Sequence, residues 1–329
     1  MKRWLAEVRH PDRYHGARRT RGPFFEGWYY KLVDASGAHR WAIIPGVFLG
    51  STPERSESFV QVLDGASGHA SYHAAPLASF SAATNAFEVS VGASRFGRDA
   101  ITLAIDDAER PVQGTLRFRG VTPWPVTWRS PGVMGWYAWV PFMECYHGVV
   151  SLDHAIEGRL RIGDETIDFS GGRGYIEKDW GQAFPSAYVW TQSNHFERPG
   201  ISLSASVAMI PWIGRSFRGF LVGLLCDGVL HRFTTYRGAT IESLAVDETH
   251  VRWTVRDRQL RLALCATRAA GGLLHAPVRT EMHRRVDETL QATVEVELTE
   301  IAGGRTLFAG QGHHAGLEVH GDLETLLRS

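Results

Sequence analysis

The stretch at residues 174–197, which reads GYIEKDWGQAFPSAYVWTQSNHFE, carries the strongest information about the fold of this chain. It places Glu177 and Asp179 on either side of Lys178, directly before Trp180. A plain core strand would not carry three charges at this position, because burying an unpaired charge has a large free-energy cost. We therefore expect these polar groups to satisfy one another or to face a cavity.

Strand geometry sorts the side chains in and around this stretch. Successive side chains of a strand point to opposite faces, so Glu177 and Asp179 share a face if the strand continues through them. A strand over residues 189–196 and another over residues 25–31 would each group three more polar or aromatic side chains on one face: Trp190, Gln192 and Asn194 in the first, and Glu26, Trp28 and Tyr30 in the second. Such a face is typical of the interior of a β-barrel that binds a ligand.

The rest of the chain also predicts strands and turns. Asp227-Gly228 and Gly163-Asp164 each separate two runs of strand-forming residues, which is a strong signal for a two-residue hairpin. Further turns are expected near residues 34–37, 64–68, 171–172, 271–272 and 303–304. Strands at this spacing indicate an all-β sandwich or barrel, and helical periodicity is confined to short pieces, chiefly residues 322–328.

A sequence pattern that occurs twice predicts two domains. Residues 26–30 and 189–194 are both aromatic-rich and each precedes a series of hairpins. We expect two tandem antiparallel β-barrel domains, at residues 1–182 and 183–329, joined near Phe184-Pro185. The first contains a long aromatic loop at residues 121–143. Because long ordered loops are usually functional, we expect it to form a lid or wall of the cavity, with membrane contact by its tryptophans as the alternative.

Composition excludes several classes of function. The 35 Lys and Arg residues balance 35 Asp and Glu residues, so no net field attracts nucleic acid or an anionic membrane. Three widely spaced cysteines indicate reduced thiols in the cytoplasm. The first nine residues lack the apolar core of a signal peptide, and residues 201–213 alternate as in a half-buried strand rather than a membrane span. We expect a soluble protein, with transient contact to a membrane surface when it collects a hydrophobic ligand.

The stretch at residues 174–197 resembles the signature of the tocopherol cyclase family. The matching residues are EKDWG at 177–181, FP at 184–185 and WTQSNHF at 190–196, against the family pattern EKNWG…FP…W-x-Q-x-N-x-F. Asp179 replaces the usual Asn, and Ser193 stands where the plant proteins have Cys.

Three further blocks agree in family order. They read PFFEGWYYK at residues 23–31, GWY and PFMECYHG within residues 135–148, and, more weakly, LHAP at 274–277. The resemblance implies a tandem of lipocalin-like barrels, shared with carotenoid 1,2-hydratases. It also implies an intramolecular cyclase that closes a chromanol ring from a prenylated hydroquinone by protonating an alkene and adding a phenol oxygen.

This reaction needs a strong proton donor, a base, aromatic faces for a developing cation and no competing water. The candidate catalytic residues are Glu177, Asp179, Lys178 and Glu26. The candidate substrate-binding residues are Trp28, Tyr30, Trp180, Trp190, Gln192, Asn194, Trp136, Glu144 and His147. Two structural roles are the alternatives to catalysis. Residues 177–179 would form an ion-pair network that locks the two domains together, and Glu26 would be a buried carboxylate with a purely structural role.

No cofactor or metal is expected. The chain has no nucleotide fingerprint, phosphate loop, nucleophile elbow or zinc-type Cys/His set, and His313-His314 is more typical of a solvated turn. Two alternatives to the cyclase remain open: a hydratase or other cyclase, including a pericyclase, acting on a terpenoid or secondary metabolite, and a carrier that binds isoprenoid lipids without turnover.

Overall fold

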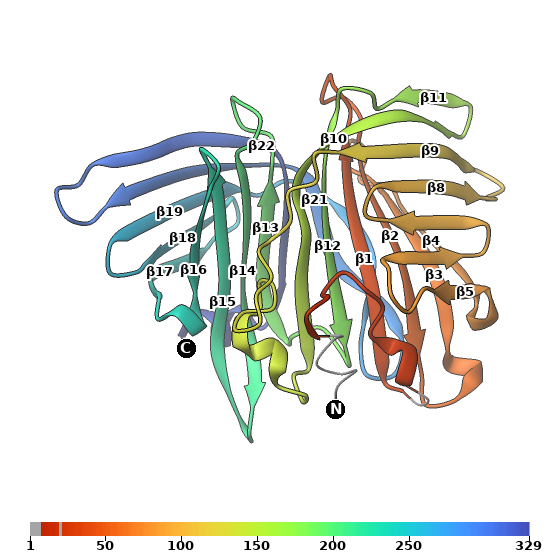
Figure 1. Ribbon diagram of the computed structural model, residues 1–329, viewed down its shortest axis with the longest axis horizontal. Coiled ribbons are helices and arrows are strands. Elements are labelled where there is room, and N and C mark those ends of the chain that lie inside the picture. The colour runs from red at the N-terminus through yellow and green to blue at the C-terminus, as the bar shows by residue number, and fades with distance from the viewer. Residues whose placement is uncertain (1–7, 20–21, 329) are drawn as a thin grey trace. The chain divides into compact units, whose positions relative to one another are not determined.

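The computed structural model describes residues 8–19 and 22–328, and antiparallel strands make up almost all of its regular structure (Figure 1). The contacts divide the chain into two compact units. The first comprises Met1–Phe184 together with Leu273–Arg285, and the second comprises Pro185–Gly272 and Val286–Ser329. The predicted domain boundary between residues 182 and 183 remains a prediction. Residues 1–7, which carry most of the signal-peptide argument, lie outside the described residues.

The first sheet has 12 strands in the order β4-β3-β2-β1-β12-β10-β9-β8-β7-β6-β5, with β11 beside β10. Its strands are β1 (Phe24–Val33), β2 (Arg40–Leu49), β3 (Glu57–Asp64), β4 (Ala70–Pro76), β5 (Phe80–Ala82), β6 (Glu88–Val91), β7 (Ser94–Gly97), β8 (Ala100–Ile105), β9 (Val112–Arg119), β10 (Cys145–Ile162), β11 (Glu165–Asp168) and β12 (Arg173–Gly181).

The second sheet has 10 strands in the order β16-β15-β14-β13-β22-β21-β19-β18-β17, with β20 beside β21. Its strands are β13 (Ala187–Ser193), β14 (Ser202–Trp212), β15 (Arg215–Cys226), β16 (Val229–Thr234), β17 (Thr240–Val246), β18 (His250–Arg256), β19 (Leu260–Thr267), β20 (Gly272–Pro277), β21 (Met282–Glu300) and β22 (Thr306–Gly321).

Helical structure is sparse, as the sequence predicts. Besides a helical residue at position 8, the described residues contain α2 (Leu323–Arg328) and five short 3-10 turns: η1 (Gly16–Arg18), η2 (Pro53–Arg55), η3 (Leu77–Ser79), η4 (Gly135–Trp139) and η5 (Thr235–Arg237). No helix in the described part of the chain is long and apolar enough to cross a membrane.

The all-β prediction is confirmed, but the expectation of closed barrels is not. Over the described residues, the pairing of the first sheet ends at β4 and β5, and that of the second ends at β16 and β17. These end strands do not pair with each other, so both sheets are open. Each sheet nevertheless encloses its own apolar core, one around Trp28 and Ile176 and the other around Val207 and Trp253.

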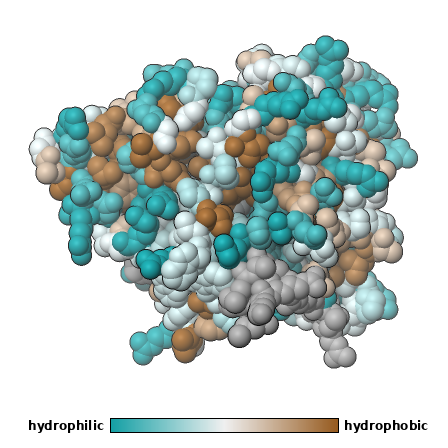
Figure 2. All heavy atoms as spheres, in the orientation of Figure 1, coloured by the Kyte–Doolittle hydropathy of each residue, from teal (hydrophilic) through white to brown (hydrophobic). Residues whose placement is uncertain are grey.

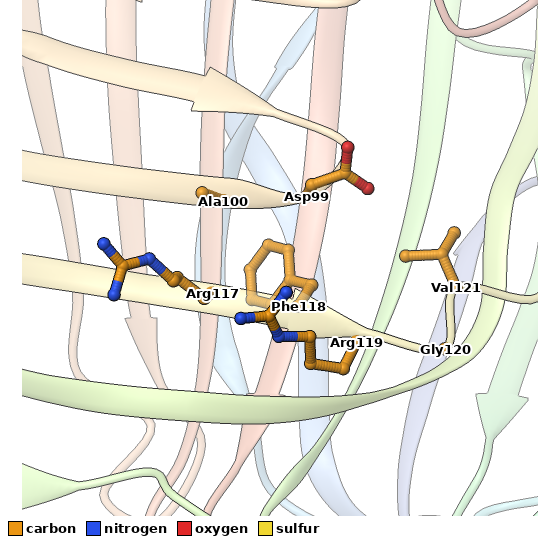
Figure 3. A pocket seen from close by; sticks show the side chains of 7 residues that line it. All are labelled: Asp99, Ala100, Arg117, Phe118, Arg119, Gly120 and Val121. Carbon is orange, nitrogen blue, oxygen red and sulfur yellow. The ribbon is translucent and has the colours of Figure 1, made fainter.

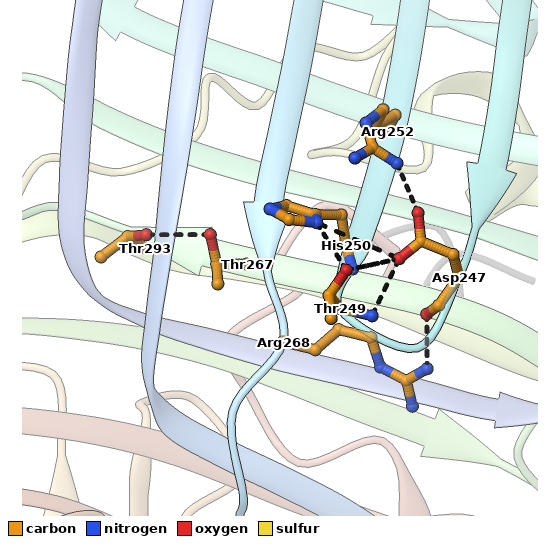
Figure 4. Close-up of polar contacts among 7 residues, drawn as sticks. All are labelled: Asp247, Thr249, His250, Arg252, Thr267, Arg268 and Thr293. Atoms are coloured by element: carbon orange, nitrogen blue, oxygen red, sulfur yellow. Dashed lines mark hydrogen bonds and ion pairs between the residues drawn. The ribbon is translucent and has the colours of Figure 1, made fainter.

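The predicted hairpin turns form where the sequence places them. Asp227 and Gly228 both adopt positive φ, of 50° and 74°, between β15 and β16, as a two-residue hairpin of this hand requires. The turn between β17 and β18 was not predicted; there the Asp247 carboxylate accepts hydrogen bonds from the backbone N–H groups of Thr249 and His250, both at 2.8 Å (Figure 4). Local side-chain chemistry therefore accounts for these strand ends.

One segment from the second half of the chain belongs to the first unit. In residues 273–285, His275 exchanges two backbone hydrogen bonds with the side chain of Gln61 on β3, each 2.8 Å long. The His275 ring also stacks on Tyr72 of β4, with 4.1 Å between the ring centroids. This segment contains the LHAP block, which therefore lies in the same unit as the other matching blocks before residue 184.

The surface combines hydrophilic and apolar side chains. Figure 2 shows hydrophilic side chains over much of the visible face, with apolar side chains gathered over part of the second sheet.

Candidate functional site

Strand β12 lies between β1 and β10, and its alternation divides the charged residues of the EKDWG motif between two faces. Glu177 is opposite Tyr29 on β1 and Val149 on β10, whereas Lys178 is opposite Trp28 and Gly148. Because paired residues of antiparallel strands share a face, Glu177 and Asp179 lie on one side of the sheet and Lys178 lies on the other.

On the first face, four side chains form what we call the carboxylate–histidine cluster: Tyr175, Glu177, His147 and Asp179. The Tyr175 hydroxyl donates to Glu177 Oε2 over 2.5 Å. The two ring nitrogens of His147 face the two carboxylates, with Nε2 3.6 Å from Glu177 Oε2 and Nδ1 2.9 Å from Asp179 Oδ1. The cluster is thus a continuous polar path that leads from a buried hydroxyl through an imidazole to a carboxylate.

The charges of this cluster favour a protonated histidine. Burial alone would lower the pKa of His147, but the carboxylates of Asp179 and Glu177 outweigh burial and raise this pKa to about 9. Exposure rises along the path, because Glu177 has 7 % of its side chain exposed, His147 has 13 % and Asp179 has 26 %. The path can therefore exchange protons with solvent at its Asp179 end.

The same three residues also form a group of metal-binding type. One donor atom from each of His147, Glu177 and Asp179 lies within 4.8 Å of the others. Imidazole and carboxylate groups suit several divalent cations, so this group is where the chain could hold one.

On the opposite face, Glu26 and Lys178 form what we call the buried ion pair. Lys178 Nζ lies 2.6 Å from Glu26 Oε1, and neither side chain has any exposure. The Glu26 carboxylate also accepts hydrogen bonds from the backbone N–H groups of His15, at 2.9 Å, and Gly16, at 3.0 Å. The Lys178 ammonium donates to the carbonyl oxygen of Arg13 and to His15 Nδ1.

Aromatic rings surround this pair. Lys178 Nζ is 5.2 Å from the centre of the Trp28 ring and 4.4 Å from that of Trp180. Trp180 stacks against the rings of His15 and Tyr146, with centroid distances of 4.4 and 5.4 Å. Residues 13–16, which precede β1, are therefore held over the core by hydrogen bonds to the ion pair and by ring stacking.

The pKa values of the buried pair are both lowered. Burial would raise the pKa of Glu26, but Lys178 and His15 outweigh it and lower this pKa. Burial lowers the pKa of Lys178 despite the attraction of Glu26. Fully buried groups that satisfy each other in this way are suited to holding a structure in place.

The remaining candidates are distributed over both units. Trp190 and Gln192 lie on β13 in the second unit, and Asn194 directly follows that strand. Tyr30 is a core residue whose hydroxyl donates to the Gly97 carbonyl oxygen. Three of the proposed partners of residues 177–179 therefore come from a different unit of the chain.

Two candidates from the block at residues 135–148 have their own surroundings. Glu144 binds Arg279 at 2.7 Å and is not the partner of His147, although the two are close in sequence. Trp136 lies in η4 and is 45 % exposed.

Sequence reasoning missed two contributors. Tyr175 lies two residues before Glu177, so strand alternation alone could have added it to the same face. No sequence signal pointed to His15, because its place depends on how the N-terminal segment folds back over β1 and β12. Lys178 forms its ion pair with Glu26, within the first unit.

A surface depression lies elsewhere in the first unit. It is lined by Asp99 and Ala100 of the β7–β8 region and by residues 117–121, which include Arg117 and Arg119 (Figure 3). None of the candidate residues lines it, so we do not assign the site there.

Comparison with solved structures supports the fold. The chain is similar to CghA in complex with Sch210972, with a TM-score of 0.56 and 11% identity over 91% of this chain and 89% of that chain. It is also similar to kievitone hydratase from Nectria haematococca, with a TM-score of 0.50 and 12% identity over 95% of this chain and 94% of that chain.

Sequence comparison identifies the family. The chain is 24% identical over 159 residues to a probable chloroplastic tocopherol cyclase from Oryza sativa subsp. japonica, a match that covers 47% of this chain and only 32% of the rice protein. The model of the family described as tocopherol cyclase-like matches residues 104–321, which is well over half of the sequence. The chain therefore belongs to the tocopherol cyclase-like family.

Proposed function

We propose that this chain is a cofactor-free intramolecular cyclase that closes a chromanol ring from a prenylated hydroquinone. The observation that carries this proposal is the placement of His147, on β10, between the two carboxylates of the EKDWG motif on β12. An acid that can be reloaded from solvent is what repeated protonation of an alkene requires.

The reaction conserves all atoms. Glu177, the most buried carboxylate of the cluster, would give its proton to the less substituted carbon of the alkene, and the phenol oxygen would bond to the tertiary carbon. Protonated His147 would transfer its own proton to Glu177 as Glu177 protonates the alkene, and the resulting neutral imidazole would accept the phenol proton, which restores the starting protonation state. Asp179 holds the imidazole at Nδ1, so that Nε2 faces Glu177.

Aromatic side chains on the face of Glu177 support the cation step. Tyr29 is directly opposite Glu177, and Phe25, further along the same face of β1, lies 5.4 Å from the Phe184 ring. Ring faces stabilise a developing cation, and a dry surface protects it from water. Trp28 and Trp180 lie on the opposite face, beside Lys178.

The other roles predicted from sequence are part of the proposal. Trp190, Gln192 and Asn194 remain proposed substrate-binding residues. Lys178 and Glu26 would support β12 rather than react. The protein would act in the cytoplasm on a small isoprenoid molecule, without nucleic acid.

A hydratase or another cyclase, including a pericyclase, is the second candidate. Asp179, in place of the family's usual Asn, adds a negative charge beside His147 and would suit a base that activates water. Proteins of similar fold include one named as a hydratase. A carrier that binds the lipid without turnover is the third candidate.

Incubation with prenylated hydroquinones, followed by mass spectrometry, tests these candidates together. The cyclase predicts a product of unchanged mass that has lost one phenol group. A gain of one water would indicate the hydratase instead. Quenching of tryptophan fluorescence without any product would indicate the carrier, and neither binding nor conversion would overturn all three.

A further inference from the structure

The exposed aromatic side chains of the first unit are concentrated in one segment. Among the described residues, each tryptophan or phenylalanine that is exposed lies between residues 121 and 143. Trp128 is 65% exposed, Trp136 is 45% exposed and Phe142 is 54% exposed, and Val126 adds an aliphatic side chain at 42%. Large apolar groups gathered in this way usually mark an interaction surface.

The tip of this segment is a defined hairpin. Val126 and Pro131 form an isolated antiparallel bridge, and Thr127 and Ser130 exchange backbone hydrogen bonds of 3.0 and 3.2 Å. Trp128 and Arg129 are therefore the two residues at the turn. The Trp139 indole N–H donates to the carbonyl oxygen of Trp128 over 3.1 Å, which ties this turn to η4.

Buried side chains in the same segment hold it to the unit. Trp124 is 1% exposed, Val133 is 2% exposed and Met143 is 4% exposed. The segment thus has apolar anchors facing inward and apolar side chains facing solvent. Residues that are fixed in an exposed position lose little conformational entropy when they meet a partner.

The charge of the segment favours a lipid surface as that partner. Residues 121–143 contain no Asp or Glu, although the whole chain has 35, and their one charged side chain is Arg129. The Arg129 guanidinium lies 4.8 Å from the centre of the Trp128 ring. Tryptophan prefers the interface between lipid and water, and an arginine beside it can reach the phosphate groups.

We propose that residues 126–142 dock this protein on the surface of a lipid bilayer, with Trp128 and Phe142 inserted at the level of the headgroups. Arg129 would pair with lipid phosphate. This surface lies outside the carboxylate–histidine cluster, so the inference is independent of which reaction the chain catalyses.

Sedimentation with lipid vesicles tests this proposal. We expect the full-length protein to bind phosphatidylcholine vesicles that contain phosphatidylglycerol more tightly than vesicles of phosphatidylcholine alone. The double variant Trp128→Ser/Phe142→Ser should lose about tenfold or more in vesicle affinity, since each side chain removes a large apolar area from water. Arg129→Gln should reduce the preference for phosphatidylglycerol about threefold.

The matched control is Ile213→Ser/Val229→Ser, which removes two exposed apolar side chains of the second unit, 78% and 53% exposed. This control should bind vesicles like the wild type. Equal loss in both double variants, or no vesicle binding by the wild type, would overturn the proposal. So would a wild-type dimer that the Trp128→Ser/Phe142→Ser variant dissociates, because the surface would then belong to a second copy.

A second measurement covers the case in which the double variant folds poorly. Lipids brominated near the headgroup should quench part of the wild-type tryptophan fluorescence. Trp128→Phe, which keeps an aromatic ring in the turn, should still bind vesicles but should lose a measurable part of that quenching. Quenching that is identical in wild type and Trp128→Phe would contradict insertion of this side chain.

Discussion

The two faces of β12 carry similar residues but differ in how those residues reach solvent. On one face, the path through Glu177 and His147 ends at Asp179, which is 26 % exposed. On the other face, Glu26 and Lys178 have no exposure and are covered by the N-terminal segment. A group that must release and regain a proton needs a route to solvent, whereas a group that holds a segment in place does not.

This comparison assigns chemistry to one face and structure to the other. The four residues of EKDW are consecutive, yet their side chains alternate between the two faces. Variants on the first face should therefore change turnover more than stability. Variants on the second face should change stability more than turnover.

The largest effect is expected from Glu177→Gln. The amide keeps the shape of the side chain but cannot donate the acid proton, so the initial rate of product formation should fall roughly 100- to 10,000-fold. The melting temperature should change little. Glu157→Gln is the matched control, because this carboxylate on β10 is exposed and pairs only with Arg119 among the described residues. Full turnover by Glu177→Gln would remove Glu177 from the chemistry.

The next largest effect concerns the buried ion pair. Glu26→Gln leaves the Lys178 ammonium without its counter-charge, and breaking a buried pair costs about 3–5 kcal/mol. Unfolding in urea should show this loss, and Glu26→Leu/Lys178→Met should recover part of it. Arg159→Gln breaks an exposed pair of 2.9 Å and should cost less than about 1 kcal/mol. Equal losses from both pairs would contradict the structural role of Glu26.

The third effect is a dependence of stability on pH. Since the folded pKa of His147 is raised from 6.5 to about 9, its stabilising contribution is complete below pH 6.5 and is lost as the pH rises to 9. The loss should be on the order of 3 kcal/mol in the free energy of unfolding. His147→Gln should flatten the curve over this range, and an unchanged slope in that variant would place the titration elsewhere.

A second histidine on β10 should change the stability with pH in the opposite direction. His154 lies against Phe118 in the core, and burial lowers its pKa to about 3. Its contribution is therefore lost as the pH falls below 6.5, so His154→Gln should change the acid side of the stability curve and leave the alkaline side as it is.

The smallest effect is expected from Asp179→Asn, which restores the residue usual in the family. Without this carboxylate, the pKa of His147 should fall and the alkaline limit of turnover should move to lower pH. The rate at neutral pH should stay within about tenfold of wild type, because Glu177 is retained. If this variant loses as much activity as Glu177→Gln, Asp179 is the proton donor.

Local sequence patterns predicted much of the fold. Alternation and turn chemistry act over a few residues, so residues 25–31 and 201–213 were predicted as strands and lie in β1 and in and around β14. The strand expected at residues 189–196 is shorter, because β13 ends at Ser193. The terminal helix at residues 322–328 was also predicted and forms α2.

Long-range arrangement could not be predicted in the same way. The pairing of Glu26 with Lys178 depends on β1 lying beside β12, and these strands are far apart in sequence. His147 was predicted only as a substrate-binding residue, whereas the pairing of β10 with β12 puts it next to Glu177 and Asp179. The return of residues 273–285 to the first unit also has no local signal.

The most direct test of the central claim is the incorporation of solvent deuterium during turnover. In D₂O the carboxyl group of Glu177 would carry deuterium, so a prenylated hydroquinone should yield a chromanol with one non-exchangeable deuterium on the ring carbon next to the oxygen-bearing tertiary carbon. Glu177→Gln should form this product at least about 100-fold more slowly. A cyclised product that contains no deuterium would contradict proton transfer from the carboxylate–histidine cluster.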